Sequence, residues 1–254
     1  MSNPTLDRPA ALGVLQDAMD SVVATQGAAI SQAAQLCTEA LAGDGIIQAF
    51  GTGHSRSFTM EIAGRAGGLI AANQLSIKDL VMYGGGDPEE ILDPTAERNP
   101  DLARRVWDLH DIRPADVFLI ASNSGINGAV VEMARLARDH GNAVVAVTSL
   151  AHSASEPSRH PSGSRLFDLA DVVIDNRGVP GDAAFPLPGG ARIVPTSTMT
   201  SVLVAQLLTA EICLALIARG IDPPVYLSAN VDGGDAHNEA LRVRYEGRLR
   251  RHEP

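Results

Sequence analysis

The sequence predicts an α/β protein in which a mostly parallel, doubly wound sheet is covered by helices on both faces. Two strand–turn–helix–strand units carry this prediction. One spans 46–73, and the other runs from "DVFLIAS" at 116–122 to "AVVAVTS" at 143–149. Strands that alternate with helices pair in parallel through right-handed crossovers. Ligands of such sheets bind at the carboxyl ends of the strands, so we expect a site there.

The N-terminal elements follow from local composition. The stretch from Pro9 to Leu41 is rich in Ala, Leu, Val and Gln at helical spacing, which predicts one long helix that Gly43 and Gly45 end. An apolar strand over 46–50 then leads through "GTGHS" into a helix over about 55–66. A short strand within "GGLIAAN" closes this first unit.

The rest of the chain alternates turn-rich runs with regular elements. The Gly, Pro and Asp density of 74–100 predicts an irregular connection with one helical turn, and a helix over about 100–110 precedes the second unit. The stretch "LAHSASEPSRHPSGSRL" predicts a polar loop, "ADVVIDN" a strand and "RGVPGDAAFPLPGG" a further turn-rich run. A long apolar helix is expected over about 197–219, followed by an ordered tail closed by a charged helix.

Composition excludes several classes of function. A chain of 254 residues with 45% hydrophobic content can bury a sizeable core. Its formal charge of −10 argues against a nucleic-acid surface, which needs a field of Lys and Arg. Cys37 and Cys213 are isolated, which favours reduced cytosol over a disulfide framework. The sequence shows no leader pattern and no uninterrupted apolar span, so we expect a cytoplasmic protein that does not contact membranes.

Two polar turns follow predicted strands and suit an anion. In the first, Gly51 and Gly53 permit a close approach to backbone amides. In the second, the hydroxyls of Ser122 and Ser124 add donors at the positive end of a helix. The alternative is that Ser and Asn side chains only cap that helix.

A dinucleotide fingerprint competes with this interpretation of the first turn. The third glycine of G-x-G-x-x-G is missing, because Arg56 stands in its place, and the following strand closes with Asn73 instead of an acidic residue. No G-K-[ST] follows either turn, which excludes a Walker loop. We predict neither a nucleotide cofactor nor any other.

Together, "FGTGHS", "LIASNSG" and "AVVAVTS" resemble the sugar isomerase (SIS) domain family, whose members bind phosphosugars. Through "RAGGL", "ADVVIDN" and "SANVDGGD" the chain is most similar to the uncharacterised sugar-isomerase-domain branch of that family, over about 35–240. The resemblance implies a three-layer αβα sandwich with a five-stranded parallel sheet. It also implies one SIS domain over 1–254, with its core at about 35–220, an N-terminal helix at 10–42 and a tail at 221–254.

The resemblance also implies which residues bind the phosphate of a sugar phosphate at the strand ends. The seryl loop of the family corresponds to Ser122, Asn123, Ser124 and Asn127, with Ser55 from the first turn and Thr148 as a weaker contact. Gly53 and His54 complete the predicted phosphate-binding set, although His54 is equally compatible with a cap at the strand end.

Aldose–ketose isomerisation needs a base that moves a proton between adjacent carbons and a group that assists ring opening. Glu61 is one candidate base; the alternative is an ion pair with Arg65 one turn later, where better-known relatives place a catalytic glutamate. Glu97, in an irregular segment, is a second carboxylate candidate, or a solvated loop acid. His237 is the best histidine candidate, or part of an ordinary surface turn.

The leading prediction is a phosphosugar isomerase. A non-catalytic phosphosugar sensor and a lyase or etherase acting on a phosphorylated amino sugar are the alternatives, and the last would use Glu61 and Glu97 as its two carboxylates. No metal is predicted, because His152 and His160 match no tight ligand spacing. The apolar helices at 10–41 and 197–219 predict a homodimer or homotetramer, with burial in the monomer core as the alternative.

Overall fold

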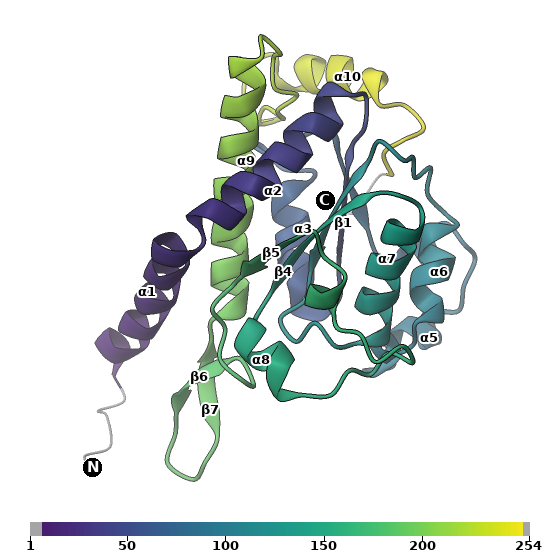
Figure 1. The fold of residues 1–254 in the computed structure, drawn as a ribbon. Coiled ribbons are helices and arrows are strands. Elements are labelled where there is room, and N and C mark those ends of the chain that lie inside the picture. Colours follow the sequence, from purple (N-terminus) through teal and green to yellow (C-terminus); the bar gives the residue numbers. More distant parts are fainter. Residues whose placement is uncertain (1–6, 251–254) are drawn as a thin grey trace.

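The computed structural model describes residues 7–250, and Figure 1 shows a central sheet between layers of helices. The elements of the sheet are β1 (Ile47–Gly51), β2 (Ala72–Leu75), β3 (Val117–Ala121), β4 (Ala143–Thr148) and β5 (Val172–Asp175). The α-helices are α1 (Arg8–Thr25), α2 (Gly27–Ala42), α3 (Arg56–Ile62), α4 (Asp79–Met82), α5 (Pro88–Leu92), α6 (Asp101–Trp107), α7 (Gly128–Asp139), α8 (Leu150–Ser155), α9 (Ser197–Ala218) and α10 (Gly234–Arg244). Short 3₁₀ turns are η1 (Gly53–Ser55), η2 (Ala96–Arg98) and η3 (Leu166–Asp168), and a separate hairpin consists of β6 (Ala183–Pro186) and β7 (Arg192–Pro195).

The central sheet has five strands in the order β2-β1-β3-β4-β5, and every pairing is parallel. This confirms the predicted three-layer α/β fold. Alternate side chains of each strand enter different cores. Ile47 and Leu119 pack with α2, α3 and α9 on one face, whereas Phe50 and Phe118 pack with α6 and α7 on the other. Burial on both faces explains why the strands are almost continuously apolar.

The order of the strands places a topological switch point between β1 and β3. The chain leaves β1 through α3 to reach β2 on one side, and leaves β3 through α7 to reach β4 on the other. The connections after these neighbouring strands therefore diverge, on opposite faces of the sheet. Ligand crevices of doubly wound sheets form at this position, and both polar turns of the sequence lie there.

The predicted single N-terminal helix was wrong, because the chain breaks between α1 and α2 at Gln26, whose backbone leaves the helical region (φ −107°, ψ 3°). The side chain of Gln26 instead accepts a hydrogen bond from the backbone amide of Asp175, at the end of β5, at 2.9 Å. A tertiary contact has overridden helix propensity at this position.

Two boundaries also differ from the sequence prediction, and the segment predicted as a polar loop after β4 begins with the helix α8. The helix after the first turn ends at Ile62 and not near residue 66, and β2 begins only at Ala72. The turn-rich run after β5 contains the antiparallel β6–β7 hairpin, whose strands pair only with each other. Pro and Gly within and around these short strands hide the alternation that would have predicted them.

Helix α9 is long and apolar enough to cross a membrane by length and composition alone, a test that core helices also pass. In the structure it packs against α2 and α3, and Val204, Leu208 and Ile212 are buried in the core. Its other side is open: Leu214 is 66% exposed and Ile217 is 59% exposed. The helix is therefore a core element that also carries an uncovered apolar face.

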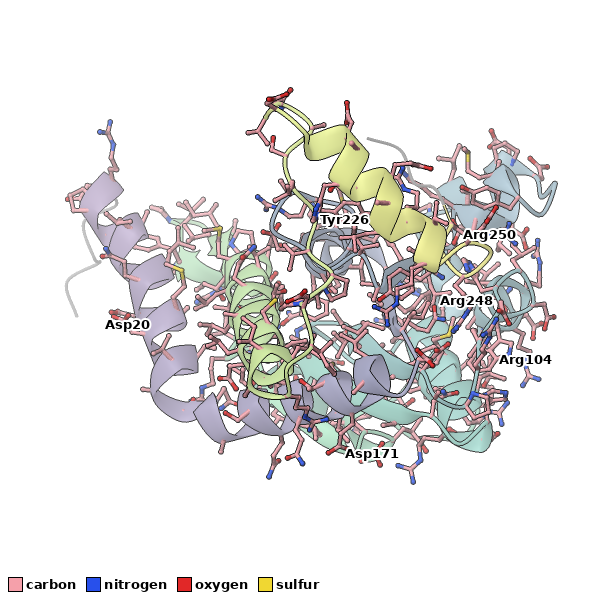
Figure 2. The ribbon with its side chains drawn as sticks, turned by 90° about the horizontal axis from the view of Figure 1, so that it is seen from above. Asp20, Arg104, Asp171, Tyr226, Arg248 and Arg250 are labelled. Atoms are coloured by element: carbon pink, nitrogen blue, oxygen red, sulfur yellow. The ribbon has the colours of Figure 1, made fainter. Side chains whose placement is uncertain are left out.

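A buried ion pair attaches the C-terminal tail to the end of the sheet at which the parallel strands begin. Figure 2 shows Arg248 and Arg250 in the segment after α10. The Nη2 atom of Arg248 donates to both carboxylate oxygens of Asp116, at 2.6 and 2.8 Å, and Asp116 also accepts from the amide of Ile46 and from Gln48. The tail thereby connects to the residues that precede β1 and β3.

Candidate functional site

The two polar turns meet at one carboxylate. Thr52, which directly follows β1, donates its hydroxyl proton to Oε2 of Glu97 at 2.5 Å. The side-chain amide of Asn127, which follows β3, donates to Oε1 of the same residue at 2.6 Å. Thr52 and Asn127 are each 5% exposed, and Glu97 is partly buried. Glu97 thus joins the ends of the two strands at the switch point, although it lies 30 residues before Asn127 in the chain.

The turn after β3 is a tight loop packed against the end of β4. The hydroxyl oxygen of Ser122 accepts from the amide of Gly125 at 3.1 Å, and Gly125 has a positive φ of 63°. A Cβ on Gly125 would lie 2.8 Å from Oγ1 of Thr148 and 2.7 Å from Oγ of Ser153. Only glycine fits this position without displacing those side chains. This loop geometry therefore requires glycine at position 125.

Thr148 supports the loop from behind. Its side chain is fully buried at the end of β4, and its hydroxyl donates to the carbonyl of Asn123 at 3.3 Å. The side chain of Asn123 is itself held by Asn176 at 3.2 Å and lies 3.4 Å from Nδ1 of His152. Ser124 is more exposed than Ser122, which places it at the outer side of the loop.

Asn127 is the N-cap residue of α7, but its side chain makes no capping hydrogen bond to the helix. Its amide is committed to Glu97, and its Oδ1 accepts from Arg159 at 2.7 Å. The amides of the first turn of α7 are therefore not capped by Asn127, and the positive end of the helix dipole points at the loop. This geometry speaks against a purely capping role for Asn127.

The turn after β1 lies on the other side of the Glu97 carboxylate from the loop after β3. Gly53 and His54 are exposed in η1, and Ser55 is partly buried. A Cβ on Gly53 would lie 3.8 Å from Oε2 of Glu97, so this glycine is next to the carboxylate. Of the predicted members of the first turn, Gly53 therefore lies beside the Glu97 carboxylate.

The segment that carries Glu97 packs tightly on the start of α7. A Cβ on Gly128 would lie 2.2 Å from the carbonyl oxygen of Arg98, the residue after Glu97. The absence of a side chain at Gly128 therefore sets how closely η2 approaches the seryl loop.

Gly128→Ala is expected to lower the free energy of unfolding by about 1–3 kcal/mol, the usual cost of overpacking. Urea denaturation measures it. Gly13→Ala is the matched control, because a Cβ there meets no atom within 4 Å. Alanine in that helix should be neutral or stabilising. If Gly128→Ala costs no more than Gly13→Ala, the close approach of η2 is not required.

The other two predicted catalytic residues lie elsewhere. Glu61, on α3, forms an ion pair with Arg65 and accepts a hydrogen bond from Gln206 of α9. His237, on α10, is exposed, and its Nε2 lies 3.1 Å from the carbonyl oxygen of Val225. Figure 1 shows α10 at the opposite end of the sheet from α8. One copy of the chain therefore does not bring His237 to the seryl loop.

Within residues 7–250, no group of three or more His, Cys, Asp and Glu side chains could hold a metal ion. The histidines of the polar loop have other partners: His152 lies beside Asn123, and Nε2 of His160 is 3.0 Å from the Glu132 carboxylate.

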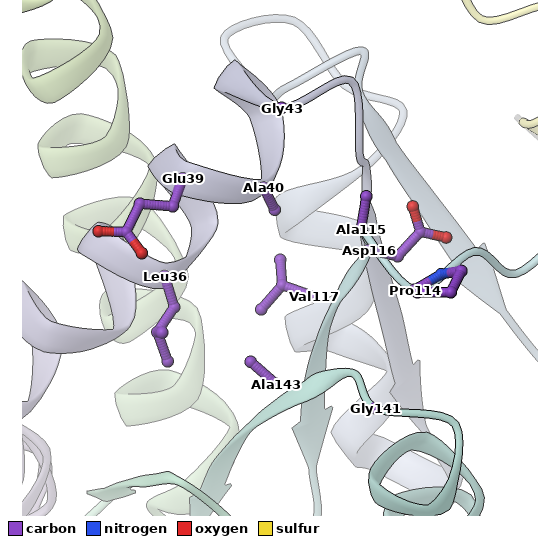
Figure 3. A pocket seen from close by; sticks show the side chains of 10 residues that line it. All are labelled: Leu36, Glu39, Ala40, Gly43, Pro114, Ala115, Asp116, Val117, Gly141 and Ala143. Carbon is purple, nitrogen blue, oxygen red and sulfur yellow. The ribbon is translucent and has the colours of Figure 1, made fainter.

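Two cavities lie away from the seryl loop. One of about 300 Å³ lies between the end of α2 and the starts of β3 and β4, and its charged lining residues are Glu39 and Asp116 (Figure 3). The other, of about 600 Å³, is lined by Arg65, Arg242 and the acidic residues Asp235 and Glu239, among others. Both lie toward the end of the sheet at which the strands begin, so neither is at the switch point between the carboxyl ends of β1 and β3.

The fold and the polar loops together define a doubly wound α/β protein whose two polar turns lie at the switch point between β1 and β3, the usual place of a ligand site in such sheets. A model of the SIS domain matches residues 12–149, more than half of the chain, and this protein belongs to that family. The chain is 36% identical to a UPF0309 protein of Listeria monocytogenes serotype 4b, over 91% of this chain and 92% of the relative. It is 38% identical to a UPF0309 protein of Geobacillus kaustophilus, over 87% of this chain and 86% of the relative.

Two solved structures share the fold. The phosphoheptose isomerase of Neisseria gonorrhoeae superposes with a TM-score of 0.53 at 20% identity, covering 80% of this chain and 95% of that one. The phosphoheptose isomerase of Francisella tularensis gives 0.54 at 18% identity, covering 84% and 98%. At these identities the likeness concerns the fold alone.

The sequence predicts the position of the seryl loop after its strand, but no local pattern pointed to Thr52 or Arg159 as part of the site. Thr52 lies inside the quoted "GTGHS" motif, where only its position after the strand pointed to the site. Arg159 lies in the polar loop after β4, and no local pattern connects it with Asn127.

Proposed function

We propose that this protein binds a sugar phosphate at the carboxyl ends of β1 and β3 and interconverts its aldose and ketose forms. The observation that carries the proposal is the Glu97 carboxylate, held between Thr52 and Asn127 beside the seryl loop. Membership of the SIS domain family and the fold shared with two phosphoheptose isomerases support it.

The phosphate is assigned to the seryl loop. Ser122, Ser124 and the uncapped first turn of α7 supply hydroxyl and amide donors, which suit an anion without adding charge. Asn123 and Asn127 orient the loop, Thr148 supports it, and Gly53, His54 and Ser55 close the side formed by the first turn.

Glu97 is assigned as the base in preference to Glu61. In the proposed reaction its carboxylate removes the proton from C2 of the open-chain aldose, and an enediol forms as the C1 carbonyl oxygen takes up a proton from water. The protonated carboxyl then returns the proton to C1, and the C2 hydroxyl releases its own proton to water, which leaves the C2 carbonyl of the ketose. The hydrogen bonds from Thr52 and Asn127 fix the carboxylate beside the loop. Glu61 is instead committed to Arg65 and Gln206. This proton transfer needs neither a metal nor another cofactor.

Ring opening is assigned to His237 of a second copy of the chain. Because α10 lies at the far end of its own sheet, His237 requires a homodimer or homotetramer to reach a seryl loop. The exposed apolar side chains of α9 and α1, which include Leu214, Ile217 and Val23, give such an assembly a surface to bury. Light scattering measures the mass directly, and a monomer would remove this role from His237.

We place the protein in the cytoplasm, acting as a single SIS domain without nucleic acid or membrane partners. Both cysteines are free. Burial raises the pKa of the Cys37 thiol to about 12, so that thiol stays protonated and unreactive.

A thermal-shift screen of aldose, ketose and N-acetylamino sugar phosphates, each beside its unphosphorylated sugar, tests the proposal. A ligand at 100 times its Kd should add about 2.7 kcal/mol to the free energy of unfolding. Only phosphorylated compounds should stabilise the protein, and Ser124→Ala should weaken their effect. Ser31→Ala, an exposed change on α2, is the control. Equal stabilisation by unphosphorylated sugars, or none by any compound, contradicts phosphate binding at the loop.

A further inference from the structure

The segment 156–166, which we call the strap, crosses the seryl loop. The amide of Arg159 donates to the carbonyl of Ile126 at 2.9 Å, and the amide of Leu166 donates to the carbonyl of Gly125 at 2.8 Å. Backbone bonds at two points therefore hold the strap against residues 125 and 126 of the loop.

The side chain of Arg159 turns toward the site. Its Nη1 atom donates to Oδ1 of Asn127 at 2.7 Å, although the residue as a whole is exposed. This bond uses one of the several N–H donors of the guanidinium and leaves the others for a ligand. Guanidinium is suited to phosphate because it can donate two parallel hydrogen bonds to two oxygens.

A buried contact between His160 and Glu132 also holds the strap. Nε2 of His160, the residue after Arg159, lies 3.0 Å from Oε2 of Glu132 on α7, whose side chain is fully buried. Arg135 and Arg104 also contact Glu132, at 2.8 and 2.6 Å. Hydrogen bonds from Arg135 first, and from His160, lower the pKa of the Glu132 carboxyl, so it is ionised at neutral pH. His160 therefore positions the neighbouring Arg159.

A positively charged side chain would offset the repulsion between a bound phosphate and the carboxylate of this site. The seryl loop offers only neutral donors, and the Glu97 carboxylate is joined to the same Asn127 side chain. A dianionic phosphate in this loop would be repelled by Glu97 and by the overall charge of −10. Arg159 lies on the opposite side of Asn127 from Glu97, where it can balance that charge.

We propose that Arg159 is a phosphate-binding residue of this site and that the strap, pinned by His160 to Glu132, positions its guanidinium for that role. This inference rests on the proposed function and adds a charged residue from a segment outside the two turns.

The test titrates wild type, Arg159→Gln and Arg165→Gln with inorganic phosphate at constant ionic strength, and then with the sugar phosphate that stabilises the wild type most. Thermal stabilisation gives each Kd. Arg159→Gln should weaken both ligands by roughly 10- to 100-fold, the usual loss for a charged hydrogen bond. Arg165 is the matched control, because it lies on the same strap but donates to the carbonyl of Glu156.

His160→Ala tests the positioning role. If His160 acts through Arg159, the affinity for inorganic phosphate should fall in this variant, and adding His160→Ala to Arg159→Gln should cause no further loss. A purely structural role would give additive losses.

The outcomes separate this inference from the proposed function. If Arg159→Gln binds phosphate as the wild type does while Ser124→Ala does not, Arg159 is not a phosphate ligand and the seryl loop stands. If Arg165→Gln weakens binding as much as Arg159→Gln, the effect is one of general charge and the inference is overturned. If the wild type binds neither phosphate nor any sugar phosphate, both proposals are overturned.

Discussion

Glu97→Gln is expected to lower the turnover of the sugar phosphate by about 10²- to 10⁴-fold while leaving its affinity nearly unchanged. Glutamine removes the basic oxygen but keeps the shape of the side chain. Its amide oxygen can still accept from Asn127, and its NH₂ can donate to the hydroxyl of Thr52, so the contacts that join the two turns survive. The loss should therefore appear in kcat and not in KM.

Glu61→Gln is the matched comparison, because it neutralises a second carboxylate that is paired with Arg65. Its turnover should stay near that of the wild type. If Glu61→Gln abolishes turnover and Glu97→Gln does not, Glu61 is the base. If both variants abolish turnover, a two-carboxylate lyase or etherase becomes the better assignment. If the wild type binds sugar phosphates but neither isomerises nor cleaves them, the protein is a sensor.

Arg248→Ala is expected to lower the free energy of unfolding by about 3–5 kcal/mol, the usual cost of leaving a buried charge without its partner. Arg248 is 7% exposed, and its Nη2 atom bonds to both oxygens of Asp116, whose side chain is fully buried. Asp116 would keep its bonds from Ile46 and Gln48, but it would lose its cation.

Urea denaturation at neutral pH measures this change. Arg244→Ala is the control, because Arg244 is exposed and lies 3.9 Å from the exposed Asp44. An exposed pair of this kind contributes about 0–1 kcal/mol. If Arg248→Ala costs less than about 1 kcal/mol, water replaces the guanidinium, and the tail does not stabilise the end of the sheet at which the strands begin.

The parts of the site that could be predicted are those with a local pattern. Gly125 and the serines beside it follow an apolar strand and precede an amphipathic helix, so the position of the loop could be read from neighbouring residues. The same pattern predicted the loop at the carboxyl ends of the strands, because parallel strands all end on the same side of the sheet.

The position of Glu97 could not be derived in the same way. Its segment, 74–100, has little periodicity, and it reaches the site only because Gly128 lets the carbonyl of Arg98 approach α7. The alternative considered for Glu61, an ion pair with Arg65, depends on local spacing, and the structure contains that pair. The break at Gln26 was missed because its cause is a contact with Asp175, 149 residues away.

The sequence by itself determined the α/β class, the parallel sheet, the membership of a family and the two polar turns, because strand and helix periodicity and turn chemistry act over a few neighbouring residues. The tertiary structure decided which charged groups surround those turns. Glu97 and Arg159 both reach Asn127, at separations of 30 and 32 residues. Such contacts depend on how the layers pack, and no pattern within a short stretch of sequence encodes them.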